Sequence, residues 1–275
     1  MNRDYLILHN GVLLPQKGIG TYQLAPGDET YQSVLVALQQ GARHIDTSII
    51  YRNEKDVGRA IVASGINRND IFVTGKLPPH IKNHDGVMRM FERSLNNLGL
   101  DYLDAYIINA PGPFDDLDGD YDEGNVIAYK ALEELYRNKR VRAIGVSQFH
   151  VPQLTNILSH CDIVPHINQI SFFVGHTQPE IVSFCLDHDI AIQAFSPLGK
   201  GYLLSNDKLV SVAKRYGVTP AQIALAYNME KRVASIPKAK TLSHIIANNE
   251  LDIALDPSDI ASLDQIVNDP RRYDD

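Results

Sequence analysis

Short β-branched apolar runs alternate along most of the chain with longer stretches in which apolar and polar residues follow a helical period. This alternation is typical of repeated βα units and a parallel sheet. The expected strands are residues 18–21, 42–47, 71–76, 103–109, 142–147, 166–170, 190–195 and 233–238. Eight consecutive βα units predict an α/β fold of the (β/α)8 TIM-barrel type.

Local signals refine this pattern at three places. The segment "ETYQSVLVALQQG" predicts a helix with a glycine stop at Gly41, and Thr219 with Pro220 predicts the start of another helix. Asn10-Gly11 lies between two apolar runs, which predicts a hairpin ahead of the first unit. We expect this hairpin to cover the bottom of the barrel, and the absence of any linker-like segment predicts a single domain over residues 1–275.

Composition agrees with an ordinary globular domain. The 275 residues fit one barrel, and 44% hydrophobic with 21% charged residues is enough to form a sizeable core. The net charge of −7 and the lack of a basic cluster argue against nucleic-acid and anionic-membrane partners. No apolar run is long enough for a signal peptide or a membrane span, and the two cysteines suit a reducing compartment. We therefore expect a cytoplasmic protein.

Several expected strands end on a polar residue, where a plain core would have an apolar one. In a (β/α)8 barrel the C-terminal ends of the strands converge on the face that carries the active site. Any one of these residues can be explained as a local cap, but their recurrence on separate strands favours a shared site. They are Asp46, Lys76, Asn109, Ser147 with Gln148, Gln169 and Lys238.

Asp46, Tyr51 and Lys76 are suited to proton donation. A tyrosine has an ordinary pKa near 10, a nearby ammonium lowers that pKa, and a carboxylate keeps the lysine charged and oriented. A tyrosine tuned in this way can donate a proton to a developing alkoxide, which indicates carbonyl reduction. The segment "GIGTYQ" has Gln23 where a Rossmann fingerprint needs its third glycine, so a nicotinamide cofactor would have to lie across the barrel mouth.

These residues stand in segments that resemble the aldo-keto reductases, in the family's order and over nearly the whole chain. The segments are "GARHIDTSIIYRNEKDVGRAI", "FVTGKL", "RAIGVSQFHVPQL", "INQI", "AFSPLGKG", "TPAQIALAYN" and "IPKA". The chain is similar to the bacterial branch near the 2,5-diketogluconate reductases and glyoxal reductases. The resemblance implies a (β/α)8 barrel, hydride transfer from NADPH to an aldehyde or ketone, a monomer, and no metal. It assigns Asp46, Tyr51 and Lys76 as acid, proton donor and tuning lysine.

Asn109 departs from the family pattern. The family has a histidine at the end of strand four, in a segment like L-I-H-W-P, whereas this chain has "IINAP". An asparagine amide is also a neutral hydrogen-bond donor, but it reaches less far and cannot titrate. We expect a working but slower reductase. The potassium-channel β subunits of the same superfamily, which are thought to sense redox state, resemble the chain in having asparagine there, so a cofactor-binding regulatory protein is the alternative.

The resemblance also implies a cofactor site. Ser147, Gln148 and Gln169 correspond to the family's contacts to the nicotinamide carboxamide, and Phe195 replaces a tyrosine that stacks on the ring. The other expected cofactor-binding residues are Gly20, Thr21, Ser196, Leu198, Lys238, His244 and Asn248.

At the adenosine end the family pattern is K-[ST]-x4-R. Lys238 is kept, Ala239 lacks the hydroxyl, and His244 replaces the arginine, with Lys240 as a compensating cation. Loss of a permanent bidentate cation weakens selectivity for a phosphate. We expect NADPH to be preferred, with NADH also accepted.

Tyr22 and Phe114 are candidates for the substrate wall, and the acidic segment 115–123 is expected to border the substrate site and disfavour anionic substrates. That segment fails the EF-hand template, because starting at Asp116 its glycine falls at position four and Ile127 takes the place of the bidentate glutamate. Small aldehydes, dicarbonyls or keto-sugars are the expected substrates.

The histidines do not predict a metal site. His44 and Asp46 share one strand face, but a metal site needs further ligands on other strand ends, and His166 lies near the start of its strand. His80 and His84 have helical spacing, but Pro78-Pro79 predicts a loop with solvated histidines. No metal is expected.

Overall fold

The computed structural model describes residues 4–116 and 119–267, and within them the strands of the barrel form one eight-stranded sheet in chain order. All its neighbouring strands are parallel. The strands are β3 (Gly18–Gly20), β4 (His44–Asp46), β5 (Phe72–Leu77), β6 (Leu103–Ile108), β7 (Val141–Ser147), β8 (Ile167–Ser171), β9 (Ala191–Phe195) and β10 (Ala234–Ser235). Each overlaps one predicted strand, so the predicted barrel is confirmed.

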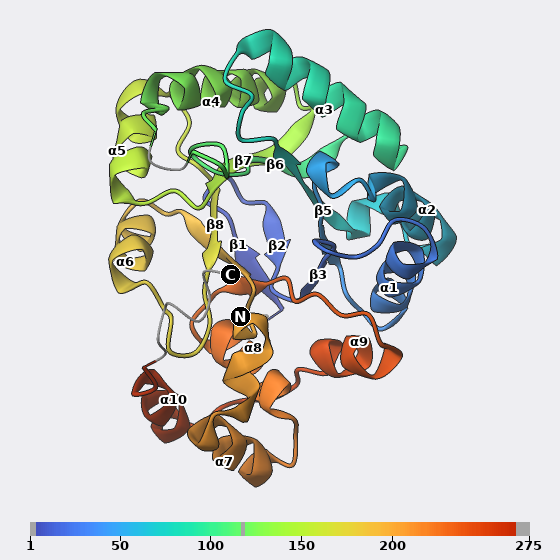
Figure 1. Cartoon of the computed structure of the whole chain (residues 1–275), viewed down its shortest axis with the longest axis vertical. Helices are drawn as coiled ribbons and strands as arrows, with labels where there is room; N and C mark the ends of the chain where they lie inside the picture. Colours follow the sequence, from blue (N-terminus) through green and yellow to red (C-terminus); the bar gives the residue numbers. More distant parts are fainter. Residues whose placement is uncertain (1–3, 117–118, 268–275) are drawn as a thin grey trace.

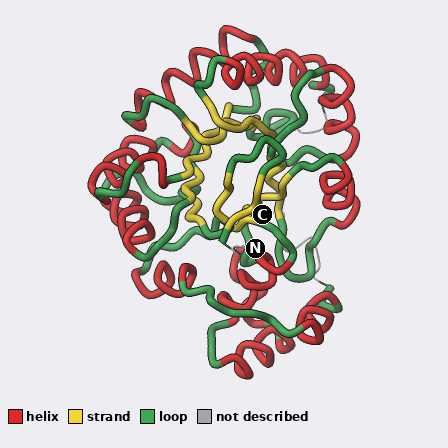
Figure 2. Tube along the Cα trace, turned by 180° about the vertical axis from the view of Figure 1, so that it is seen from behind, coloured by secondary structure: helices red, strands yellow, loops and turns green. Residues whose placement is uncertain are grey.

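Helices cover the outside of this ring of strands (Figures 1 and 2). They are α1 (Asp28–Gln39), α2 (Glu54–Ser64), α3 (His84–Leu98), α4 (Asp122–Arg137), α5 (Val151–His160), α6 (Pro179–Asp187), α7 (Asp207–Tyr216), α8 (Pro220–Glu230), α9 (Leu242–Asn249) and α10 (Pro257–Asp264), with the short helices η1 (Ile49–Tyr51), η2 (Arg68–Asp70) and η3 (Gly199–Ser205). In the described part of the chain none of them is long and apolar enough to cross a membrane.

Two predicted helix boundaries are confirmed. At the start of α8, Thr219 and Gln222 bond each other's backbone N–H through their side chains, which satisfies two donors that the first helical turn leaves free. After α1 the chain turns at Gly41, whose φ of 95° suits a residue without a Cβ atom.

The barrel strands serve two cores because successive side chains point to opposite faces of a strand. Side chains such as Phe72, Ile107 and Ile167 form an inner core inside the barrel. Their outward neighbours, for example Val73 and Ile108, pack in the larger core beneath the helices. Inward positions further along the strands carry polar side chains, and these form the site described below.

A hairpin closes the lower end of the barrel, as predicted. β1 (Tyr5–Ile7) pairs with β2 (Leu13–Pro15) in antiparallel register, and Figure 1 shows both strands within the ring. Leu6, Leu8 and Leu14 are buried in the inner core beside Phe72. The hairpin therefore supplies the apolar plug that excludes water from the bottom of the barrel.

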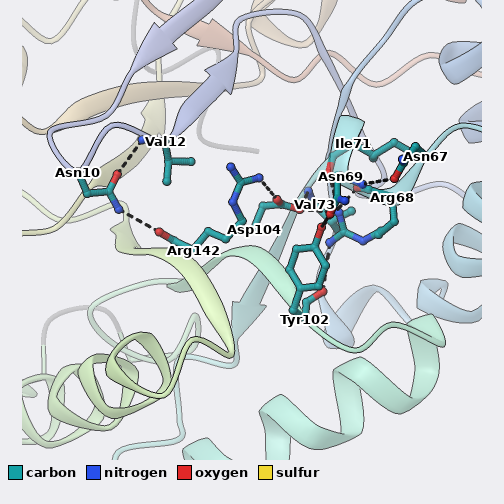
Figure 3. Close-up of polar contacts among 10 residues, drawn as sticks. All are labelled: Asn10, Val12, Asn67, Arg68, Asn69, Ile71, Val73, Tyr102, Asp104 and Arg142. Atoms are coloured by element: carbon teal, nitrogen blue, oxygen red, sulfur yellow. Dashed lines mark hydrogen bonds and ion pairs between the residues drawn. The ribbon is translucent and has the colours of Figure 1, made fainter.

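A buried carboxylate ties the strands together at the same end (Figure 3). Asp104 is fully buried and receives ion pairs from Arg68 and Arg142, each at 2.8 Å. The backbone N–H of Val73 also donates to Asp104, over 2.9 Å. Three donors on one carboxylate offset the cost of burying its charge, while Asn10 of the hairpin donates to the Arg142 carbonyl over 2.9 Å.

The seam between the first and last barrel strands is narrow. The backbone N–H of Gly20 donates to the Pro237 carbonyl over 3.2 Å, and Lys17 forms an isolated parallel bridge with Ser235. A Cβ atom on Gly20 would lie 2.7 Å from the Ile236 carbonyl oxygen. Glycine is therefore required here for the barrel to close.

Candidate active site

The C-terminal ends of β4 and β5 bring three predicted site residues into one hydrogen-bonded chain. The Lys76 ammonium lies 2.5 Å from a carboxylate oxygen of Asp46 and donates to the Tyr51 hydroxyl over 2.9 Å. Asp46 and Lys76 are each only 2% exposed. Tyr51 is positioned by η1, whose single turn carries the chain from the end of β4 back over the barrel mouth.

The protonation states of this chain follow from burial and charge. Burial alone lowers the pKa of Lys76, but the Asp46 carboxylate and the Tyr51 hydroxyl outweigh burial and raise it above its ordinary value. For Tyr51, burial raises the pKa and the Lys76 charge offsets only part of that rise. The expected net lowering of the tyrosine pKa was therefore wrong, because the sequence does not reveal how deeply the phenol is buried. Tyr51 keeps its proton at neutral pH.

Two amides hold the other oxygen of Asp46. Gln169 donates to it over 2.7 Å, and Gln193 donates over 3.4 Å. Sequence reasoning assigned Gln169 to the cofactor and missed Gln193. The available signal was a polar residue inside the buried strand "AIQAF", two positions before Phe195 and hence on the same face.

His44 connects this site to the hairpin plug. Its Nδ1 lies 3.2 Å from the Pro15 carbonyl, and its Nε2 lies 3.1 Å from the Thr74 hydroxyl and 3.2 Å from the Gln193 amide nitrogen. Burial lowers the pKa of His44 to about 3, so the ring is neutral. A carbonyl only accepts, so Nδ1 carries the hydrogen and Nε2 accepts.

In the described ranges no group of three or more histidine, cysteine, aspartate or glutamate side chains is arranged to hold a metal ion.

Asn109 follows β6 at the edge of the mouth. Its backbone N–H donates to the Leu77 carbonyl over 3.0 Å, and its carbonyl accepts from the Gln148 side chain over 3.2 Å. The residue is 5% exposed, and its side-chain amide bonds no other residue in the part of the chain that the structure describes. A side-chain amide at the mouth that bonds no other described residue can donate to a bound ligand.

A cavity of about 310 Å³ opens beside the ends of β7, β8 and β9. Three predicted cofactor residues line it: Gln148, Phe195 and Ser196. Gln148 and Ser196 have positive φ angles of 61° and 48°, so the chain turns sharply where each strand enters the mouth. Lining residues that the sequence reasoning missed include His150, Phe173, His176 and Gln178.

The other residues predicted for the nicotinamide side do not line this cavity. Ser147 ends β7 and is buried, and Leu198 precedes η3 and packs against the core. The Thr21 hydroxyl donates to the Asp46 carbonyl over 3.0 Å. The Thr21 hydroxyl therefore already has a structural role. Gly20 also has one, because a side chain at that position would prevent the barrel seam from closing.

A second cavity, of about 360 Å³, lies next to η1. It is lined by Ile50, Pro79, His80, Pro113, Phe114 and Asp115. Phe114, a predicted substrate-wall residue, lines this cavity, and the centroid of the Tyr22 ring lies 5.1 Å from that of the Tyr51 ring. Of the predicted acidic segment, Asp115 borders this cavity, whereas residues 117–118 lie outside the described residues.

His84 was predicted to lie in a loop, but it is the first residue of α3. The helix begins there because the Asn83 side chain accepts from the Gly86 N–H. His84 is half exposed and bonds Glu134 over 2.9 Å.

At the predicted adenosine end, long side chains cross the barrel seam. Lys238 donates to Gln23 over 3.4 Å, and Lys240 forms an ion pair with Glu29 at 2.9 Å. His244 is exposed in the first turn of α9, and Asn248 is buried further along it. Lys240 was expected to be an available cation, but its charge is already paired.

A parallel barrel whose mouth joins a buried lysine–aspartate pair to a protonated tyrosine, beside a cavity with an aromatic wall, defines a barrel oxidoreductase suited to carbonyl chemistry. The Aldo/keto reductase family pattern matches residues 18–268, and the chain belongs to this family. The chain is therefore an enzyme of the class that reduces carbonyl compounds with NAD(P)H.

Individual relatives agree with this assignment. The chain is 36% identical to glyoxal reductase of Bacillus subtilis (strain 168) over 270 residues, which cover 98% of this chain and 95% of that protein. A crystal structure of an aldo/keto reductase from Brucella melitensis is similar with a TM-score of 0.88 and 36% identity, covering 95% of this chain and 98% of that one. A Bombyx mori aldo-keto reductase in complex with NADP has a TM-score of 0.85 and 31% identity, covering 95% and 92%.

Proposed function

We propose that this protein reduces small aldehydes, dicarbonyls or keto-sugars to alcohols, with Tyr51 as the proton donor and NADPH as the preferred cofactor. The observation that carries the proposal is the hydrogen-bonded chain from Asp46 through Lys76 to the Tyr51 hydroxyl. Similarity to a glyoxal reductase supports small carbonyl compounds as the substrate class. NADPH, when bound, supplies the hydride.

The three residues have separate roles in this proposal. Tyr51 holds its proton until a carbonyl oxygen gains negative charge beside it. The Lys76 ammonium, 2.9 Å from the phenol oxygen, stabilises the phenolate that remains after the proton has moved. Asp46 keeps Lys76 charged and fixed, since burial alone would favour the neutral amine.

Asn109 takes the position of the family histidine and orients the substrate carbonyl. Its buried side-chain amide bonds no other described residue and can therefore donate to a carbonyl oxygen. The amide is shorter than an imidazole and cannot titrate, so we propose slower turnover than histidine would give. A misplaced oxyanion donor costs less than the loss of roughly 10²–10³ in rate that follows its removal.

The first cavity fits a nicotinamide cofactor. Phe195 presents an aromatic face to this cavity, and Gln148 also lines it. We propose that Gln148, Ser147 and the side-chain oxygen of Gln169, whose N–H donates to Asp46, contact the carboxamide. We propose the remaining contacts for Ser196, Leu198, Lys238, His244 and Asn248, and backbone contacts for Gly20 and Thr21. An adenosine end without the family's arginine supports a modest preference for NADPH over NADH.

The second cavity is proposed as the substrate site because Ile50 places it next to Tyr51. Phe114 lines this cavity, and the Asp115 carboxylate there disfavours anionic substrates. We propose Tyr22, whose ring packs against that of Tyr51, as a second wall residue for the substrate. We further propose that the chain is one domain over residues 1–275, acts as a monomer in the cytoplasm and needs no metal.

Carbonyl-dependent oxidation of NADPH by the purified protein tests this function. The panel includes methylglyoxal and an aromatic aldehyde, and Tyr51→Phe, which keeps the ring and removes only the hydroxyl, is the control. Turnover that this variant abolishes establishes the reductase. Tight NADPH binding without turnover on any substrate supports the alternative of a redox-sensing regulatory protein, which Asn109 favours.

A further inference from the structure

Glu29 is an acidic side chain fixed at the adenosine end of the proposed cofactor site. Its carboxylate oxygen accepts from the Ala25 backbone N–H over 2.7 Å and pairs with the Lys240 ammonium at 2.9 Å. Glu29 lies in the first turn of α1, just after β3, whereas Lys240 follows β10. The ion pair therefore spans the seam of the barrel, beside the contact between Lys238 and Gln23.

The charge of Glu29 is secure at neutral pH. The backbone donor Ala25 and the neighbouring Lys240 hold the pKa of this carboxyl below its ordinary value. Its side chain is 33% exposed and that of Lys240 is 46% exposed, so both groups are within reach of a ligand from solvent. A full negative charge thus stands beside the cations that a phosphate would use.

We propose that Glu29 determines cofactor selectivity by lowering the affinity for NADPH relative to NADH. This inference rests on the proposed function, since it concerns the same cofactor site. A phosphate monoester carries a charge of about −1.5 to −2 near pH 7, whereas NADH has a neutral hydroxyl at that position. A carboxylate can accept a hydrogen bond from a hydroxyl, but it repels a phosphate.

The ion pair between Glu29 and Lys240 lowers the affinity for NADPH in two ways. A phosphate must compete with the Glu29 carboxylate for the Lys240 ammonium, and it must also approach that carboxylate. Neither cost applies to NADH, because its binding leaves the ion pair intact. A permanently charged arginine would offset this repulsion of the phosphate, but His244 takes the arginine's position in this chain.

Cofactor dissociation constants measured by isothermal titration calorimetry test the inference without reference to turnover. In Glu29→Gln the amide oxygen still accepts from Ala25, so the loop geometry is kept while the charge is lost. We expect NADPH to bind about 3- to 10-fold more tightly and NADH to change by less than about twofold. The NADPH gain should shrink as ionic strength rises, since exposed charges are screened.

Two further variants complete the experiment. Lys240→Met should weaken NADPH binding, and in the double variant Glu29→Gln/Lys240→Met the gain for NADPH should be smaller than in the single variant. Glu92→Gln, which breaks an exposed ion pair with Arg140 elsewhere on the surface, is the matched control for net charge and should leave both constants unchanged.

The proposal is overturned if Glu29→Gln changes NADPH and NADH binding equally or changes neither. That result is distinct from a failure of the proposed function, in which the unaltered protein itself binds neither nucleotide.

Discussion

Gln169 and Gln193 lie side by side in register on β8 and β9, and both donate a side-chain N–H to the same oxygen of Asp46. The other oxygen of Asp46 receives Lys76. The carboxylate is therefore oriented by strands on the far side of the barrel as well as by its neighbour. Burial raises the pKa of Asp46, and each of these donors opposes that rise by favouring the ionised form, which holds Lys76 in place.

The variant Gln193→Met tests this relationship, because methionine is similar in size and unbranched but offers no N–H. We expect kcat to fall about 3- to 10-fold, the effect of one modest hydrogen bond. Loss of the donor raises the pKa of Asp46, so the deficit in kcat should grow toward low pH. The Kd for NADPH should stay unchanged, and a kcat equal to the parent value across the range from mildly acidic to mildly basic pH would show that Gln193 is only a packing residue.

Lys76→Met should destabilise the fold as well as abolish turnover. Both partners of the ion pair are 2% exposed, and removal of one leaves the Asp46 charge buried without its cation. Such a loss typically costs about 3–5 kcal/mol in the free energy of unfolding, which urea denaturation at neutral pH measures.

The double variant Asp46→Asn/Lys76→Met separates this electrostatic cost from a packing defect. It should be more stable than Lys76→Met alone, because no charge remains buried. If the double variant is equally or less stable, the cost arises from packing around the lysine stem.

The barrel and its reactive trio could be predicted because both depend on local pattern. Each barrel strand is a short apolar run, and in a parallel barrel the strand ends must meet, so the order of the strands alone places Asp46 close to Lys76. Strand ends were less certain. β10, expected over 233–238, covers only Ala234–Ser235 because the chain there leaves β9 to close the seam with β3.

Contacts across the barrel could not be predicted in this way. Gln193 sits inside a buried strand, and nothing in the sequence states that its inward neighbour is Asp46. The pairing of Lys240 with Glu29 depends on how the loop after β10 lies against the start of α1, and these segments are far apart in the chain. The pKa direction of Tyr51 depends on burial by the folded mouth, which residue types alone do not define.

Two buried histidines should make the protein lose stability in mild acid. Burial lowers the pKa of His44 to about 3, and burial together with the neighbouring His9 lowers that of His166 to about 4. In the unfolded chain both pKa values return to about 6.5, so below this pH the unfolded state binds more protons. Stability is fully present above about pH 6.5 and falls toward about pH 4, by about 1.4 kcal/mol per pH unit for each histidine.

His166→Phe measures one half of this effect. The phenyl ring keeps the stack on His9, whose ring centroid lies 4.4 Å from that of His166, but it cannot titrate. Urea unfolding at about pH 7, 6 and 5 should show a slope of stability against pH that is shallower than in the parent by about 1 kcal/mol per unit on average over this range. Parallel slopes would mean that His166 is protonated as readily in the folded state as in the unfolded one.

Substitutions at Asn109 test how the substrate carbonyl is polarised. Asn109→Leu keeps a side chain of similar size but removes the donor, so kcat should fall about 10²- to 10³-fold with the Kd for NADPH unchanged. Asn109→His restores the longer donor and should raise kcat, while adding a pH dependence near the imidazole pKa that the parent lacks. Profiles of kcat from mildly acidic to mildly basic pH for the three proteins distinguish the cases. If Asn109→Leu turns over as fast as the parent, the carbonyl is oriented by Tyr51 alone and the asparagine has no part in the reaction.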